Sequence, residues 1–322
     1  MKSEVICIAK KQKRLSVTQQ IMVEVKESLN RYQHDLTRQQ YTRNMKYFVQ
    51  YCRQEHNCRT LDECRAHVDE YINTLIDKEL SASTIHTYAA SICAVLKIPL
   101  NSISKPRRVI AEFTRGRDEI KYPHSSQKPE NYSRLFCFAE KVGIRRAEYA
   151  KLKGCDWVYD ESGNRCIFVR SGKLGKPQKQ LVRQEDIPYF EDFFASIPDD
   201  EYVFSKAEMN NHLNLHKLRS DNVKRWYSEL EEKLKTDPSY AEVMIKQIKK
   251  RVENSINPKT GKPRVFNEQS VVGYYYLRGE LRKRQIEANK PICFNRLILQ
   301  FLSIFCLSHY RQNVCVQNYL LA

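Results

Sequence analysis

Apolar residues recur at helical spacing in the first third of the chain. Between residues 41 and 52 they stand three and four positions apart, which is the period of an amphipathic helix. The sequence Thr60-Leu-Asp-Glu63 is a capping box and predicts the start of the next helix. A third helical pattern begins at Ser81 or Ser83 and stops at Pro99. The apolar face of the second of these helices is Cys64, Val68, Tyr71, Ile72 and Leu75. Residues 17–104 are therefore predicted to form a small all-helical domain.

The pattern of the second half of the chain is also mainly helical, with one interruption. Residues 135–139 predict a helix that ends at Gly143, a residue suited to the left-handed turn after a helix. Residues 166–171 and 179–183 are strand-like, and the two glycines between them predict a hairpin. The predicted fold class is mainly α, with a small antiparallel β-sheet in a second domain over residues 129–322.

Two basic segments show no regular period. Residues 1–16 are expected to form an arm, and residues 105–128, rich in proline, serine and cations, are expected to form a linker. In a protein that closes around a DNA duplex, such a linker lies beside the phosphates. A solvated connector explains the same composition equally well.

Charge narrows the choice of partner. The chain has 55 lysine and arginine residues against 38 aspartate and glutamate residues, a net charge of +17. Such a surface attracts a polyanion, so nucleic acid is the expected partner. A basic protein without a specific partner has the same balance of charges.

The sequence predicts a cytoplasmic protein, associated with the nucleoid when on DNA and without contact to a membrane. It has no run of about 18 uninterrupted apolar residues, and the apolar run near its start is too short and too broken for a signal peptide. Its eleven cysteines are then expected to be reduced thiols. Cys52, Cys58 and Cys64 lie near His56 and His67, but packing in a helical core fits their spacing better than a metal site.

Four signals in the second domain point to chemistry. The first is Arg145, which follows the predicted helix end at Gly143 and precedes Glu148 by three positions. The second is Lys173, on the hairpin tip with Lys176 close behind. Taken alone, the first is typical of a surface helix start, and the second of a solvated turn residue.

The other two signals lie further along the chain. His216 and Arg219, three positions apart, share one face of a helix. His309 and Tyr319 stand within one compact segment near the end. Alone, this segment is equally well explained by a buried histidine and a packing tyrosine.

The order of these residues resembles that of the tyrosine recombinases, the phage integrase family. The resemblance covers essentially the whole chain, and residues 80–98 resemble the last helices of the family's core-binding domain. It implies a helical, SAM-like core-binding domain over residues 17–104 and a tyrosine recombinase catalytic domain over residues 129–322.

The resemblance also implies a role for each residue. Arg145 and Arg219 would clamp the scissile phosphate, since guanidinium groups offer paired and permanently charged donors. Tyr319 would be the nucleophile and His216 its base. His309 would donate another hydrogen bond to the phosphate, and Lys173 would protonate the leaving 5′ oxygen. The bond to Tyr319 conserves the phosphodiester energy, so no ATP, metal or other cofactor is expected. Glu148 is expected to orient its neighbours rather than react.

Several departures from the family pattern are visible. Arg219 and His309 stand 90 positions apart (309 minus 219), which implies an insertion at about 232–290 that either grips DNA or is a solvated helical addition. Ser308 replaces a glycine that is frequent there, and Ser220 and Asp221 follow Arg219. The sequence ends three residues beyond Tyr319, so subunit assembly is expected to rely on contacts other than a C-terminal tail. Rival nucleophiles are Tyr310 and the run 274–276.

The leading hypothesis is a site-specific recombinase, the integrase of a mobile genetic element. It would act on double-stranded DNA attachment sites as a transient homotetramer, with accessory proteins as further partners. Two alternatives remain: a recombinase-like protein that binds DNA without cutting it, and an enzyme similar to type IB topoisomerases, which use related chemistry on one strand.

Overall fold

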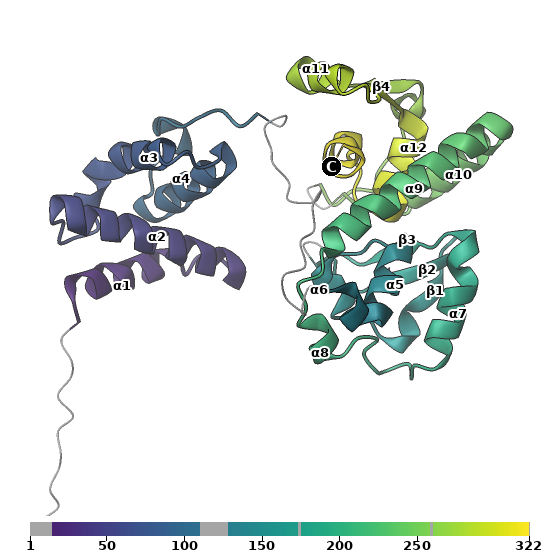
Figure 1. Cartoon of the computed structure of the whole chain (residues 1–322), viewed down its shortest axis with the longest axis horizontal. Coiled ribbons are helices and arrows are strands. Elements are labelled where there is room, and N and C mark those ends of the chain that lie inside the picture. Colours follow the sequence, from purple (N-terminus) through teal and green to yellow (C-terminus); the bar gives the residue numbers. More distant parts are fainter. Residues whose placement is uncertain (1–14, 110–127, 173–174, 258–259, 322) are drawn as a thin grey trace, which may run out of the picture. The chain divides into compact units, whose positions relative to one another are not determined.

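The computed structural model describes residues 15–109, 128–172, 175–257 and 260–321. The chain divides into two compact units, Met1–Phe113 and Thr114–Ala322. Each unit is described by itself below, and Figure 1 labels their elements. The division falls within the segment that the sequence predicts to be a linker, most of which lies outside the described residues. The predicted arm, residues 1–16, also lies almost wholly outside them.

The first unit is helical throughout its described part. Its elements are α1 (Val17–Leu29), α2 (Asp35–His56), the 3-10 turn η1 (Glu63–His67), α3 (Val68–Asp77), α4 (Ala82–Leu96) and the 3-10 turn η2 (Leu100–Ser102). Ser16 caps α1 and Ser81 caps α4, each accepting the amide hydrogen of the residue three positions on. The predicted apolar face at residues 64–75 is buried in the core of this unit. The element that follows Thr60 begins as a 3-10 turn, however, and becomes an α-helix only at Val68.

The second unit contains the predicted hairpin within a three-stranded antiparallel sheet. Strands β1 (Trp157–Tyr159), β2 (Arg165–Val169) and β3 (Gln178–Leu181) are paired in sequence order. The alternating pattern predicted β2 and β3 but not β1, which is only three residues long. At the hairpin tip Gly175 has φ +74°, a conformation that favours glycine. The fold class, mainly α with a small antiparallel sheet, is confirmed.

Helices surround this sheet and continue to the end of the chain. Before β1 come η5 (Pro129–Tyr132), α5 (Ser133–Lys141), α6 (Arg146–Tyr149) and η6 (Gly154–Asp156). After β3 come η8 (Gln184–Asp186), α7 (Ile187–Ala195), α8 (Lys206–Met209) and α9 (Leu215–Thr236). The remaining elements are α10 (Tyr240–Glu253), η9 (Glu268–Val271), β4 (Tyr274–Tyr276), α11 (Gly279–Glu287), β5 (Cys293–Asn295), α12 (Arg296–Phe301), the π-helical turn η10 (Leu302–Cys306), α13 (Gln312–Cys315) and the π-helical turn η11 (Val316–Leu320).

Gly143 corrects one prediction. It is not in the left-handed conformation expected of a glycine that ends a helix; α5 ends at Lys141 instead. The glycine is required by a close approach, because a Cβ atom at this position would stand 2.8 Å from the Cα atom of Arg219. Gly143 thus allows α9 to pack directly against the chain that leads to α6.

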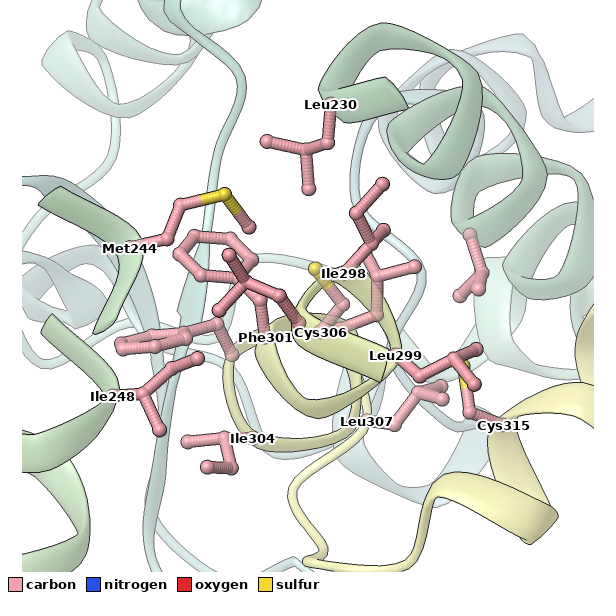
Figure 2. Packing of buried hydrophobic residues seen from close by; sticks show 14 of the residues in the cluster. Leu230, Met244, Ile248, Ile298, Leu299, Phe301, Ile304, Cys306, Leu307 and Cys315 are labelled. Carbon is pink, nitrogen blue, oxygen red and sulfur yellow. The ribbon is translucent and has the colours of Figure 1, made fainter. Parts of the chain in front are cut away.

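Helix α10, in the long segment between α9 and α12, contributes to the core. Figure 2 shows Met244 and Ile248 of α10 packed with Phe301 and Ile304 of the C-terminal helices. On the outer side of α10, Arg251 pairs with Asp160 at 3.2 Å and Lys250 donates to the carbonyl of Glu161. One face of α10 is therefore buried and two of its cations bind protein groups, while the two predicted alternatives for the insertion, a DNA grip and a solvated addition, stay predictions. None of the described helices is both long and apolar enough to cross a membrane.

Candidate active site

Arg145 lies at the entrance to α6, held by a residue of that helix. Its backbone is extended (φ −85°, ψ 153°), so the helix begins at the next residue. The carboxylate of Glu148 accepts from the Arg145 amide at 2.7 Å and from its guanidinium at 2.6 Å. The Arg145 side chain keeps 28% of its surface exposed, whereas Glu148 keeps 3%. The guanidinium is thus fixed at its inner end and open to solvent at its outer end.

Arg219 approaches the same carboxylate from α9. Its side chain is fully buried, and its Nη1 atom lies 3.7 Å from the second oxygen of Glu148. Its Nη2 atom donates to the carbonyl oxygens of Cys306 and Leu307 at 3.4 and 3.3 Å. The close approach permitted by Gly143 is what brings this arginine beside α6.

The two arginines therefore share both of their partners. The Leu307 carbonyl, contacted by Arg219, also accepts from Nη2 of Arg145 at 3.4 Å, and Glu148 lies between the two guanidinium groups. Within the described residues, Nε and Nη1 of Arg219 are buried and have no hydrogen-bond partner. Buried donors are normally satisfied in folded proteins. Two positive charges beside one carboxylate, with donors to spare, make a site suited to an anion.

Tyr319 lies next to Arg219. The guanidinium carbon of Arg219 is 5.6 Å from the centroid of the tyrosine ring, and the ring of His216 is 5.6 Å away in an edge-on arrangement. Tyr319 is 5% exposed. Its carbonyl oxygen accepts from the hydroxyl of Ser220 at 2.6 Å. His216, Arg219 and Ser220 lie within one turn of α9, which explains why all three meet the turn that carries Tyr319.

His309 is close to this group because it follows Leu307 in the sequence. It stands two residues after Leu307, and the turn is made by Ser308, whose φ of +59° is unusual for a serine. The His309 amide donates to the carbonyl of Ser303 at 2.8 Å, and the amide of Arg311 donates to its Nδ1 at 3.2 Å. These bonds fix the direction of the imidazole ring.

Five of the six predicted site residues can thus be located. Arg145, His216, Arg219 and Tyr319 form one connected group, with His309 adjoining it. Lys173 lies outside the described residues, although Gly172 and Lys176 on either side close the hairpin with a 2.8 Å bond.

Two members of the group were not predicted as contacts. The carbonyl of Leu307 and the hydroxyl of Ser220 reach this group only because the chain folds back on itself, so no local sequence pattern predicts their contacts. Glu148 was expected to orient its neighbours, and it does contact both arginines.

Cysteines beside the site are not suited to attack. Burial raises the pKa of the Cys306 thiol well above its ordinary value and that of the Cys315 thiol to about 12. A thiol must ionise before it reacts, so both are inert at neutral pH.

The rival tyrosines have other surroundings. The hydroxyl of Tyr310 donates to Ser255 at 2.8 Å, and the guanidinium of Arg264 covers its ring at 4.2 Å. In β4, Tyr274 and Tyr276 are more than half exposed, and the ring of Tyr275 faces Arg296.

Comparison with known proteins adds little. No family model matches the chain, and no curated protein matches it either. Among solved structures, a crystal structure of XerA recombinase is similar at 17% sequence identity. The match covers 65% of this chain and 84% of that one, with a TM-score of 0.22. A similarity of this size carries no argument about function. The function must therefore be inferred from the positions of the side chains described above.

Proposed function

We propose that this protein is a site-specific DNA recombinase of the tyrosine recombinase type. The observation that carries the proposal is the position of Arg219, which joins the paired arginine site to Tyr319. Its guanidinium shares Glu148 and Leu307 with Arg145, lies beside the tyrosine ring and keeps two buried donors without a hydrogen-bond partner in the described residues.

The arginine pair would bind the phosphate to be cleaved. Attack on a phosphodiester adds negative charge to its two nonbridging oxygens, and donors already in place stabilise that charge without reorganising. When DNA is absent, Glu148 neutralises part of the positive charge of the two arginines. It also holds both guanidinium groups in position. Arg219 is buried by the protein itself, so its two unused donors would reach the anion only after the residues that cover them move.

Tyr319 would attack the phosphorus atom. A bond forms between the tyrosine oxygen and phosphorus, and the bond from phosphorus to the 5′ oxygen breaks. A phenol is protonated at neutral pH, so its proton must leave during attack. His216 is the neighbouring group that can take it, and Arg219 favours the negative charge that develops on the tyrosine.

The leaving oxygen needs a proton in return. Lys173 is the proposed donor, on the hairpin between β2 and β3, with His309 as a further hydrogen-bond donor to the phosphate. The product is a 3′-phosphotyrosine and a free 5′ hydroxyl. A 5′ hydroxyl from another strand can reverse the step and rejoin DNA without an energy source.

The proposal extends to the assembly. Recombination needs two duplexes, each cut on both strands, so four copies of the chain would act together on double-stranded DNA. The first unit would bind the duplex as the core-binding domain, and accessory proteins would set the direction of exchange.

A trapping experiment tests the proposal. Duplexes are first selected from a randomised library by their binding to the Tyr319→Phe variant. A nick is then placed just downstream of the cleavage site, so that the short fragment with the free 5′ hydroxyl diffuses away after cleavage. The wild-type chain should accumulate a covalent DNA adduct, the Tyr319→Phe variant should not, and the control variant Tyr310→Phe should. Tight, salt-sensitive binding without any adduct would replace the proposal with DNA binding alone. Relaxation of supercoiled plasmid that needs no particular site would favour a topoisomerase.

A further inference from the structure

Two histidines and a glutamate of the first unit meet at the junction of α2 and α3. His56 is the last residue of α2, His67 directly precedes α3, and Glu70 lies in the first turn of α3. One ligand atom from each lies within 4.8 Å of the other two. The sequence associated these histidines with neighbouring cysteines, but the structure pairs them with a carboxylate.

The ligand atoms of the three side chains lie at distances that suit a shared ion. Nε2 of His56 lies 3.0 Å from Oε2 of Glu70, and Nδ1 of His67 lies 3.5 Å from the same oxygen. The two rings are stacked, with centroids 3.6 Å apart and an angle of 11° between their planes. Because a metal lies in the plane of the imidazole that binds it, one of the two rings would have to turn about its Cβ–Cγ bond before both nitrogens could bind one ion. Tetrahedral zinc with bonds of about 2.0 Å separates its ligand atoms by about 3.3 Å. The two nitrogen–oxygen distances lie on either side of that value.

A simple ion pair does not account for this geometry. Within the described residues, Nε2 of His56 is buried and has no hydrogen-bond partner, although a carboxylate oxygen is 3.0 Å away. The nitrogen therefore faces the oxygen in a direction unsuited to a hydrogen bond. A cation between the two atoms would satisfy both, since imidazole nitrogen and carboxylate oxygen are common zinc ligands.

The carboxylate of Glu70 also contacts a tyrosine. The hydroxyl of Tyr51 hydrogen-bonds to Glu70. This bond directs the carboxylate, as the outer partners of metal ligands commonly do. The Glu70 side chain is 53% exposed, so an ion can enter from solvent.

The nearby cysteine side chains are packed in the core. Cys52, Cys58 and Cys64 belong to the buried core of this unit, and the thiol of Cys64 donates to the carbonyl of Thr60 at 3.3 Å. Zinc thiolate ligation would require these side chains to leave the core, whereas the ligand atoms of the two imidazoles and the carboxylate already lie within 4.8 Å of one another.

We propose that His56, His67 and Glu70 bind Zn²⁺, with water completing the coordination. The ion would tie the end of α2 to the start of α3 across residues 57–66. Its effect would be to stabilise the first unit. The site is independent of the proposed strand cleavage, to which none of the three side chains contributes.

Zinc titration of the full chain tests this proposal. After removal of metal with a chelator, calorimetry should show one Zn²⁺ bound per chain, with a higher melting temperature in its presence. Glu70→Gln and His67→Ala should each weaken binding at least about tenfold. His34→Ala, which removes a histidine at the start of α2, is the matched control and should leave binding unchanged. Melting of each variant without metal shows whether it folds.

Two further measurements test the role of Tyr51 and the identity of the ligand atoms. Tyr51→Phe retains the ring but removes the hydroxyl, and should weaken zinc binding by about ten- to a hundredfold. Co²⁺ in place of Zn²⁺ should give no thiolate charge-transfer absorption in the near ultraviolet. Equal affinity in wild-type, Glu70→Gln and His67→Ala chains, or a strong thiolate band, would overturn the assignment.

Discussion

The guanidinium of Arg219 lies 5.6 Å from the ring of Tyr319 and also donates a hydrogen bond to the carbonyl of Leu307. One buried side chain of α9 therefore connects the paired arginine site to the turn that carries the tyrosine. If the proposed chemistry is correct, the phosphate clamp and the nucleophile are positioned by the same residue.

Replacing Arg219 with lysine should abolish most of the strand cleavage. Lysine keeps the charge but loses the planar, forked set of donors. Loss of one such donor set costs about a hundred- to a thousandfold in rate. Adduct formation on the nicked duplex measures the effect. Arg225→Lys, an exposed position on the same helix, should cleave at the wild-type rate; an active Arg219→Lys chain would contradict the clamp.

Replacing Glu148 with alanine should destabilise the second unit. The carboxylate lies between two guanidinium groups and caps α6. Removing one partner from a buried charge pair costs about 3–5 kcal/mol. Urea unfolding measures the loss. Glu280→Ala removes an exposed pair with Arg284 and should cost less than about 1 kcal/mol. Equal stability of the two variants would show that Glu148 does not hold the arginines.

Replacing Gly143 with alanine should impair cleavage through a displacement of α9. The added Cβ would meet backbone, at 2.8 Å from the Cα atom of Arg219, so α9 must shift. We expect a lower melting temperature and a loss of adduct formation in the folded fraction. Gly175→Ala is the comparison. Its added Cβ would have no other atom within 4 Å, so the only strain comes from the backbone conformation of this residue. Full cleavage by the Gly143→Ala chain would show that the close approach is not required.

The segment between α10 and β4 is predicted to support the loop between His309 and Tyr319. Tyr310 contacts Ser255 and Arg264, and Gln312 donates to the carbonyl of Ser270 at 2.8 Å. Tyr310→Ala should slow cleavage several-fold with DNA affinity unchanged, as measured by single-turnover kinetics and gel shift. Tyr310→Phe keeps the ring beneath Arg264 and should retain most of the rate. A uniform loss of affinity would instead place this segment on the DNA.

Local patterns predicted much of this architecture. The helical periods, the Ser81 cap of α4 and the glycine-containing hairpin each act over a few residues, so they can be recognised in sequence. The three-residue strand β1 has too short a pattern to be seen. Gly143 illustrates the limit: its requirement arises from α9, which lies far away in sequence, and not from its own turn.

The candidate site was predictable only in part. Arg145, His216, Arg219 and Tyr319 were predicted by their order, and the structure brings them together. The carbonyl of Leu307 and the hydroxyl of Ser220 carry no sequence signal, since any residue offers a carbonyl and serine is common. Likewise, Glu70 could not be paired with His56 before the packing of α3 on α2 was known.

The most direct test identifies the residue that becomes bonded to DNA. The account predicts that the covalent adduct, digested with trypsin and nuclease and examined by mass spectrometry, carries its nucleotide on the peptide from Gln312 to the C-terminus. That peptide contains Tyr319 as its only tyrosine. Tyr310 falls in the preceding peptide, which ends at Arg311, and Tyr274 to Tyr276 fall in another. A nucleotide on either of these peptides would contradict Tyr319 as the nucleophile.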